Sequence, residues 1–330
     1  MQSTQVQPKR KHAVIIMESS GEIGNNISQY LPADIELIPQ KSVMFNGGEI
    51  NVNPLKSIRG KHVYIVASGS SGPSSSNDIM YMLGMIRACR DASTKTITLV
   101  CPHYPYSRSD KKDQSRNPIM GKLMADLFQT AGAYRLISID LHSAQAQGFF
   151  GGPFDNLFAI NPLIKAITID YNGKEFIIIS PDAGGERRAD EWSKVLNCQM
   201  TMFTKHRDHN AVSTIVSHKL VDKLDFTNKV VIIVDDMCDT GGTLVSAATQ
   251  LREYGAEEII VAVTHGVFSA NAYDKLSQSI ISKIYTTNSM KIDNKFYVCN
   301  KFAIVDISEM IATAIGHCAN NTSISQMFAR

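Results

Sequence analysis

The sequence predicts an α/β protein made of two doubly wound parallel-sheet domains. Short apolar runs rich in β-branched residues recur along the chain, and the clearest, residues 230–234, reads VVIIV. Such a run is too short for a buried helix but suits a strand covered on both faces, as in a parallel sheet. Several runs lead into a polar or glycine-containing loop and then a segment with helical spacing. The 330 residues leave room for two domains of roughly 150 residues each.

Composition narrows the class of protein. An apolar fraction of 44% with 19% charged residues is ordinary for a globular protein, and a net charge of +2 indicates no nucleic-acid partner. The densest early basic cluster, residues 9–11, falls in a polar segment, residues 1–12, that we expect to be a disordered tail. No apolar run approaches 18 residues, and no signal-peptide pattern opens the chain, so neither a membrane nor secretion is expected. Six cysteines without C-x-x-C spacing favour a reducing compartment, which predicts a cytoplasmic protein.

The stretch after residues 230–234 predicts an anion-binding loop. Asp235 and Asp236 should stand at the carboxyl end of the strand, and a helix is expected over residues 244–254, before Gly255. Between them lie Asp239, Thr240, Gly241, Gly242 and Thr243. Loop and helix-start N–H groups converge there on a place for a phosphate, favoured by the helix dipole. The two acids would repel a phosphate, so they more plausibly accept hydrogen bonds from sugar hydroxyls or help to hold a divalent cation. A sugar phosphate fits both the anion-binding loop and the acid pair. The alternative is an ordinary βα turn with solvated acids.

The other elements divide near residue 161 into two expected domains, residues 13–160 and 161–330. In the first domain, strands are expected at residues 13–17, 62–67, 96–101 and 135–139, a hairpin at 43–52, and helices within 19–30, 79–90 and 118–130. In the second, strands are expected at residues 176–179, 199–203, 230–234, 258–264 and near 281 and 302, and helices at 244–254, 308–317 and 323–328. The last helices are candidates for packing on the first domain.

Three further loops at strand ends carry polar side chains. Residues 102–116 interleave prolines, aromatic rings and cations, which is either a surface charge run or a stacking face with mobile cations for a nucleotide triphosphate. Asp140 and His142, two apart at a strand end, should face the same way, so both can reach one Mg²⁺ directly or through water. Residues 180–185, reading SPDAGG, are either a simple turn or a second anion site. Residues 205–210, taken alone, suggest a surface turn.

These motifs together resemble one family. VDDMCDTGGT resembles the phosphoribosyl-diphosphate motif of the type I phosphoribosyltransferase fold, shared by phosphoribosyltransferases and ribose-phosphate diphosphokinases (PRPP synthetases). The DLH of residues 140–142 followed by QGFF at 147–150 resembles the diphosphokinases and not the transferases. From about residue 13 onward, the chain resembles a class I diphosphokinase. The resemblance implies two domains of phosphoribosyltransferase type with the active site between them at the strands' carboxyl ends.

The implied reaction moves the diphosphoryl group of Mg-ATP to the anomeric hydroxyl of ribose 5-phosphate, giving PRPP and AMP for nucleotide synthesis. Mg²⁺ is the implied cofactor, ATP and ribose 5-phosphate are the implied partners, and the family assembles as homo-oligomers, hexamers built from dimers. The implied ATP-binding residues, partly contributed across a subunit boundary, are Phe45, Gly47, Glu49, Arg108 and Ser109. Ribose 5-phosphate is assigned to Asp235, Asp236, Asp239, Thr240, Gly241, Gly242 and Thr243, and diphosphate to Asp182, Gly184 and Gly185. His142 and Asp182, with Asp140, are assigned to magnesium, and Lys205 and Arg207 to a catalytic loop that closes over the transferring phosphates.

The chain departs from the family pattern at three positions. Gly47 stands where Asp or Asn is usual, Ser109 replaces a glutamine, and Gly151 replaces a frequent acid. Two alternatives follow. A phosphoribosyltransferase would keep the phosphate loop but needs neither DLH, nor the arginine loop, nor a second domain. A catalytically weak or inactive regulatory subunit would explain the departures, but Lys205, Arg207, His142 and the complete ribose-phosphate loop favour activity.

Overall fold

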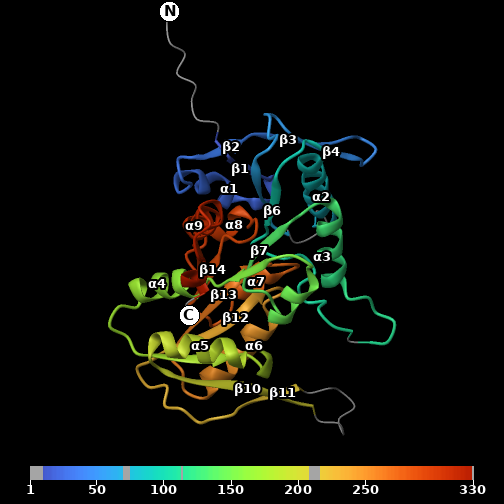
Figure 1. The fold of residues 1–330 in the computed structure, drawn as a ribbon. Coiled ribbons are helices and arrows are strands. Elements are labelled where there is room, and N and C mark those ends of the chain that lie inside the picture. The colour runs from blue at the N-terminus through green and yellow to red at the C-terminus, as the bar shows by residue number, and fades with distance from the viewer. Residues whose placement is uncertain (1–9, 70–74, 113, 208–215, 329–330) are drawn as a thin grey trace, which may run out of the picture. The chain divides into compact units, whose positions relative to one another are not determined.

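The computed structural model describes residues 10–69, 75–112, 114–207 and 216–328, without the side chains of 205–207, 216–218, 326 and 328 (Figure 1). The expected disordered tail, residues 1–12, therefore lies mostly outside the described residues. The chain divides into two compact units. The N-terminal unit contains residues up to 157 together with 308–328, and the C-terminal unit contains residues 158–307.

In the described part of the N-terminal unit, six parallel strands form one sheet in the order β2-β1-β5-β6-β7-β8. The strands are β1 (His12–Ile16), β2 (Ile35–Ile38), β5 (His62–Val66), β6 (Thr96–Val100), β7 (Arg135–Ile139) and β8 (Phe154–Leu157). Most of their apolar residues are buried, as the near-continuous β-branched runs require, whereas Leu37 of the edge strand β2 is exposed. Polar side chains therefore collect in the loops at the ends of these strands.

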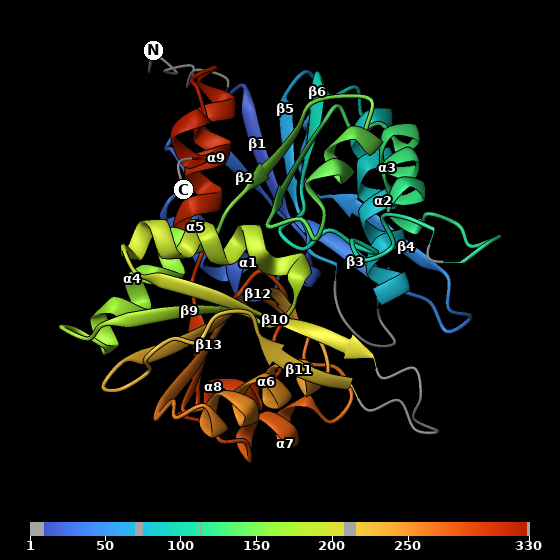
Figure 2. The same cartoon turned by 90° about the horizontal axis from the view of Figure 1, so that it is seen from below.

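Helices cover both faces of this sheet (Figure 2). On one face, α2 (Ser75–Asp91) and α3 (Met120–Ala131) pack into a core that includes Met82 and Phe128. Figure 2 shows α1 (Glu22–Asn26) and α9 (Ser308–Ala319) on the other face. A separate antiparallel hairpin, β3 (Gln40–Met44) and β4 (Ile50–Pro54), packs through Val52 against α2.

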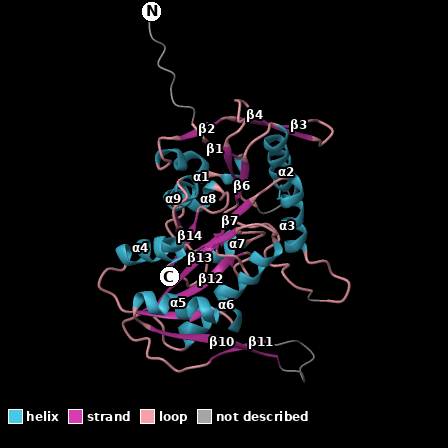
Figure 3. Ribbon diagram, in the orientation of Figure 1, coloured by secondary structure: helices cyan, strands magenta, loops and turns pink. Residues whose placement is uncertain are grey.

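The described part of the C-terminal unit holds a seven-stranded sheet in the order β11-β10-β9-β12-β13-β14-β15. The strands are β9 (Phe176–Ser180), β10 (Gln199–Arg207), β11 (Val216–Leu220), β12 (Val230–Cys238), β13 (Glu258–Gly266), β14 (Lys283–Thr287) and β15 (Phe302–Val305). The helices are α4 (Ile160–Asp170), α5 (Glu186–Leu196), α6 (Gly242–Glu253), α7 (Ala272–Ser277) and α8 (Asn294–Tyr297). Only the β10–β11 pair is antiparallel among the described strand pairs of this sheet (Figure 3). Within the described residues, no helix is both long and apolar enough to cross a membrane.

The α/β class and the parallel sheets are confirmed, but some elements differ from the prediction. The helix expected within residues 19–30 is broken into α1 and flanking 3-10 turns, and Gly21, with a left-handed φ of 56°, separates the first of these turns from α1. Strands β2, β8 and β11 and helices α4, α7 and α8 were not predicted. β2 and β8 are four residues long, which is too short for a periodicity to stand out.

Candidate active site

The acidic pair lies inside a strand and not beyond its end. β12 was expected to stop at Val234, but it continues to Cys238 because its pairing with β13 continues past Asp235 to Cys238. Asp236 is buried, with its side chain 5% exposed, and the Asp235 side chain is 27% exposed. Two carboxylates therefore lie next to each other at low solvent exposure. Their negative charges must be offset by a neighbouring positive charge or by hydrogen bonds.

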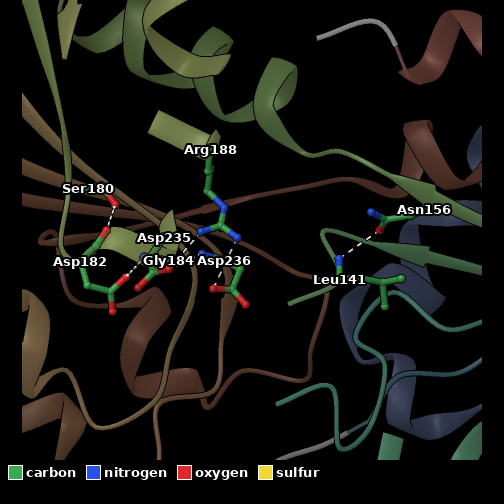
Figure 4. Close-up of polar contacts among 8 residues, drawn as sticks. All are labelled: Leu141, Asn156, Ser180, Asp182, Gly184, Arg188, Asp235 and Asp236. Atoms are coloured by element: carbon green, nitrogen blue, oxygen red, sulfur yellow. Dashed lines mark hydrogen bonds and ion pairs between the residues drawn. The ribbon is translucent and has the colours of Figure 1, made fainter. Parts of the chain in front are cut away.

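Arg188 provides that compensation (Figure 4). Its Nη1 donates to Asp235 Oδ1 at 3.1 Å, and its Nη2 lies 3.5 Å from Asp236 Oδ1. The backbone N–H of Asp236 also donates to Asp235 Oδ1, at 2.9 Å. Arg188 belongs to α5, which begins after the SPDAGG loop and packs on β9, the strand beside β12. Sequence reasoning missed this residue; the signal was its place in the first turn of the helix that follows an anion-type loop.

The acid pair has perturbed protonation. Burial and repulsion by Asp236 raise the pKa of Asp235 above its ordinary 3.8, while Arg188 and the Asp236 N–H act in the opposite direction. The folded protein therefore binds more protons than the unfolded chain between pH 3.8 and the raised pKa. A folded-state pKa above the unfolded one means that the stability of the fold falls as pH rises through this window.

The direction of this pH dependence can be tested by replacing Asp235. We expect the unfolding free energy of Asp235→Asn, measured relative to wild type, to rise between pH 5 and pH 8, by at most about 1.4 kcal/mol per pH unit. Asparagine keeps an oxygen for Arg188 and for the Asp236 N–H but removes the titration. The measurement is urea unfolding of both proteins across that pH range. A flat or falling difference would show that Asp235 is ionised over the whole range.

The loop after β12 is fixed by its glycine and by a neighbouring turn. Gly241 has a left-handed φ of 75° and precedes α6, and a Cβ there would lie 2.9 Å from Leu276. α6 begins at Gly242, two residues earlier than predicted, so Thr243 stands in its first turn. Ser269 donates its N–H to the Asp239 carbonyl at 3.1 Å and its hydroxyl to Asp239 Oδ1. Thr240, which is exposed, lies between Asp239 and Gly241.

The SPDAGG loop lies on the adjacent strand, β9, at the same edge of the sheet as the acid pair (Figure 4). Asp182 accepts a hydrogen bond from the Gly184 N–H at 2.9 Å, and the Ser180 hydroxyl donates to the Asp182 carbonyl at 2.6 Å. A Cβ at Gly185 would lie 2.5 Å from Ser180 Oγ, so the turn closes only with glycine. The structure thus brings together the two predicted anion loops of the C-terminal unit. This is expected, because loops that follow neighbouring parallel strands lie at the same end of the sheet.

In the N-terminal unit, Asp140 and His142 follow β7. Asp140 has a left-handed φ of 42°, so the alternation of a strand, from which a shared direction of the two side chains was inferred, does not apply. Two hydrogen bonds hold this turn. The Leu141 N–H donates to Asn156 Oδ1 at 3.0 Å (Figure 4). The Asp140 N–H donates to the Leu157 carbonyl at 2.8 Å. His142 is exposed.

The three departures from the family pattern have distinct local roles. Ser109 Oγ accepts from the Met120 N–H at 3.2 Å, so it satisfies the first backbone donor of α3. Gly151 donates its N–H to Gln129 Oε1, and a Cβ there would lie 2.8 Å from that side chain. A Cβ added at Gly47 would meet no atom within 4 Å, so the hairpin turn leaves open space there.

The remaining ATP-binding candidates lie on exposed loops. Phe45 is 53% exposed and closes the β3–β4 turn, where its N–H donates to the Glu49 carbonyl at 2.8 Å. Arg108 is exposed on the segment between β6 and α3. Lys205 and Arg207 were expected in a loop, but their backbones form the end of β10, paired with His218 and Val216 of β11. Their side chains and residues 208–215 lie outside the described residues.

The candidate metal residues offer hard oxygen donors. Among the described residues, no three His, Cys, Asp or Glu side chains gather into a metal-ligand cluster. Mg²⁺ commonly uses one or two carboxylates together with water and substrate phosphates. In its own unit, each of the Asp182 and Asp140 carboxylates lies on a strand-end turn and is a ligand of the type that Mg²⁺ prefers.

Comparison with known proteins decides the family. A model described as the N-terminal domain of ribose phosphate pyrophosphokinase matches residues 12–132, and one described as the phosphoribosyl synthetase-associated domain matches residues 177–329. Ribose-phosphate pyrophosphokinase 1 of Candida albicans is 39% identical over 297 residues, covering 89% of this chain and 90% of the relative. This chain belongs to the ribose-phosphate pyrophosphokinase family.

Other pyrophosphokinases and a crystal structure agree. The ribose-phosphate pyrophosphokinase of Streptomyces coelicolor is 36% identical over 307 residues, 93% of each chain. The crystal structure of phosphoribosylpyrophosphate synthetase from Mycobacterium smegmatis matches 94% of this chain and 100% of its own, with a TM-score of 0.86 and 33% identity. The pyrophosphokinase relationship therefore spans both units.

Proposed function

We propose that this chain is a ribose-phosphate diphosphokinase that makes PRPP and AMP from Mg-ATP and ribose 5-phosphate for nucleotide synthesis. The observation that carries this proposal is the arrangement on β12, where a compensated acid pair leads directly into a glycine loop at a helix start. Carboxylates suit sugar hydroxyls, and backbone N–H groups at a helix start suit a phosphate. A sugar phosphate is the ligand that uses both.

In this proposal, the acid pair and the loop position the acceptor. Asp235 and Asp236, held by Arg188, accept hydrogen bonds from the ribose hydroxyls, and residues 239–243 hold the 5-phosphate. The anomeric oxygen attacks the β-phosphorus of ATP in line, the bond from that phosphorus to the α-phosphate oxygen breaks, and AMP leaves. Positioning and electrostatic stabilisation supply most of the acceleration in such transfers.

The donor is assigned to the N-terminal unit. Phe45 and Arg108 bind the base and phosphates of ATP, and Glu49 and Ser109 belong to the same set. When bound, Mg²⁺ screens the phosphate charge, with Asp182, Asp140 and His142 as the residues that would hold it directly or through water. Asp182, Gly184 and Gly185 bind the diphosphate, with the Asp182 carboxylate already anchored by the Gly184 N–H.

Location and assembly are part of the proposal. All six cysteines, each in a described segment, are free thiols, which supports a reducing, cytoplasmic location. The exposed Phe45 beside the exposed Met44 on the β3–β4 hairpin supports contact with a second copy in a homo-oligomer, a hexamer built from dimers.

Replacing Lys205 tests the chemical step. Charge on the β-phosphate grows as AMP leaves, and a cation that meets it only then lowers the barrier without tightening substrate binding. We expect Lys205→Ala to lower kcat by about a hundredfold or more, with KM values changed severalfold at most. The measurement is steady-state AMP formation against ATP and ribose 5-phosphate. Unchanged kcat would remove Lys205 from the mechanism, and no turnover by folded wild type would remove the proposed function itself.

A further inference from the structure

We propose that the N-terminal unit binds a phosphate-bearing small molecule in a basic cavity at the amino-terminal edge of its sheet. The cavity has a volume of about 530 Å³. Its polar lining comes mainly from Lys11, His12, His62, Lys95, Thr96 and Arg135. None of these residues has a role in the proposed diphosphoryl transfer.

The sheet topology gathers these side chains at one edge. His12, His62 and Thr96 are the first residues of β1, β5 and β6, and the strand register places them side by side, His12 beside His62 and His62 beside Thr96. Arg135 opens β7. All four strands are parallel, so this edge is opposite to the one where Asp140 follows β7. The cavity is therefore separate from the candidate ATP and metal residues of the same unit.

The charge of the cavity is positive. Arg135 is paired with Asp155 at 2.5 Å, but neither Lys11 nor Lys95 makes an ion pair with any described residue. The neighbouring Lys61 also forms an ion pair, with Glu36 at 2.8 Å. Two ammonium groups without an ion-pair partner among the described residues therefore line the cavity, which favours an anion over a neutral or cationic ligand.

The histidine pair of the lining includes one unsatisfied buried nitrogen. His12 Nδ1 is buried and has no hydrogen-bond partner among the described residues, whereas His62 Nδ1 has Thr96 Oγ1 at 2.7 Å. The His12 ring stacks on His62 with centroids 5.0 Å apart and lies 6.2 Å from that of Tyr64. An unsatisfied buried nitrogen is unusual in a native fold.

Burial and neighbouring charges set the pKa values of the two histidines. Burial lowers the pKa of His12, Lys11 and Lys95 lower it further, and Asp34 raises it. Burial, His12 and Lys95 lower the pKa of His62. The other titratable groups of the lining are Tyr64, Tyr134, Arg135 and Cys318 of α9. A bound phosphate would favour imidazolium and raise both pKa values, so binding should take up protons and tighten as pH falls.

The size of the cavity indicates the ligand. A volume of about 530 Å³ lies within the range of small-molecule sites and exceeds the needs of a lone phosphate ion. The site therefore suits a phosphate monoester the size of a sugar phosphate, with the phosphate at the lysines. Inorganic phosphate alone and ribose 5-phosphate are two probes that separate the phosphate contribution from that of the attached group.

The test uses ¹³C-histidine-labelled, deuterated full-length protein and the ring signals of His12 and His62, assigned with His12→Asn and His62→Asn. Each probe is added up to about 10 mM, which fills nine-tenths of a site with a Kd of about 1 mM. We expect saturable shifts of both signals, raised histidine pKa values, and tighter binding of ribose 5-phosphate than of inorganic phosphate. Lys95→Ala, a change of an exposed side chain, should weaken binding about tenfold, and the exposed Lys174→Ala of the C-terminal unit should not.

Two results would overturn the proposal. The first is that neither ring signal moves with either probe, which would leave a hydrated surface cavity. The second is that Lys174→Ala weakens binding as much as Lys95→Ala, which would mean general charge attraction. Equal binding of the two probes would contradict the assignment of a phosphate monoester. Because the signals report only on this edge, binding elsewhere in the protein does not affect the reading.

Discussion

Arg188→Met is expected to destabilise the fold by about 2 to 4 kcal/mol and to raise the KM for ribose 5-phosphate at least tenfold. Removing one partner of a buried ion pair leaves the other charge uncompensated, which typically costs several kcal/mol. Here the residual charge falls on Asp236, whose side chain is only 5% exposed. Methionine preserves much of the length of the arginine side chain, so the effect reports on charge more than on volume.

The pH dependence separates this explanation from a packing defect. Without the guanidinium, repulsion between Asp235 and Asp236 raises the folded-state pKa of the pair further above 3.8. The loss in unfolding free energy should therefore be larger at pH 8 than at pH 5.

Arg187→Met is the matched control for this experiment. Arg187 is the preceding residue of the same helix, is 75% exposed and pairs only with Glu191 among the described residues. We expect its replacement to change stability by less than about 0.5 kcal/mol at either pH, as for other surface pairs. Equal losses for the two variants, or a loss at Arg188 that does not vary with pH, would contradict the role given to Arg188.

Gly241→Ala is the second large effect, because two separate costs meet at one residue. A left-handed backbone costs an L-residue about 1 to 2 kcal/mol, and Gly241 has a φ of 75°. The new Cβ would also lie 2.9 Å from the fully buried Leu276, which must then repack at a cost of about 1 to 3 kcal/mol. We expect a total loss of about 2 to 5 kcal/mol in unfolding free energy and a ribose 5-phosphate KM raised more than tenfold.

Gly255→Ala isolates the backbone contribution. Gly255 has a φ of 95°, but no atom lies within 4 Å of the added Cβ, and the residue follows the far end of α6. Its replacement should therefore cost about 1 to 2 kcal/mol without changing the KM for ribose 5-phosphate. The two variants are compared by urea unfolding and by initial rates. If Gly241→Ala cost no more than Gly255→Ala, the contact with Leu276 would not constrain the loop.

Much of the fold was predictable because strong local signals coincide with it. The run of residues 230–234 is apolar enough to require burial on both faces, and Gly241 and Gly255 mark the two ends of α6. The extension of β12 to Cys238 was not predictable, because it depends on pairing with β13, a long-range contact that no local pattern encodes. The same holds for β11, which exists as a partner of β10.

The site was predictable in its loops and not in its supporting contacts. DTGGT and SPDAGG carry glycines whose positions match the turns that they form. Arg188, by contrast, meets Asp235 across 47 residues of chain, and Ser269 meets Asp239 across 30. Such contacts follow from strand order, which sequence periodicity alone does not supply. The cavity beside His12 was missed for the same reason, since four separate strands contribute to it.

The most direct test of the central claim is the identity of the phosphorus products formed from Mg-ATP and ribose 5-phosphate, followed by ³¹P NMR. Transfer of the diphosphoryl group predicts AMP and PRPP in a one-to-one ratio, with the paired diphosphate signals of PRPP appearing as the β- and γ-signals of ATP disappear. The same reaction should be absent without ribose 5-phosphate. Formation of ADP with a ribose bisphosphate, or no conversion by folded protein, would contradict the account.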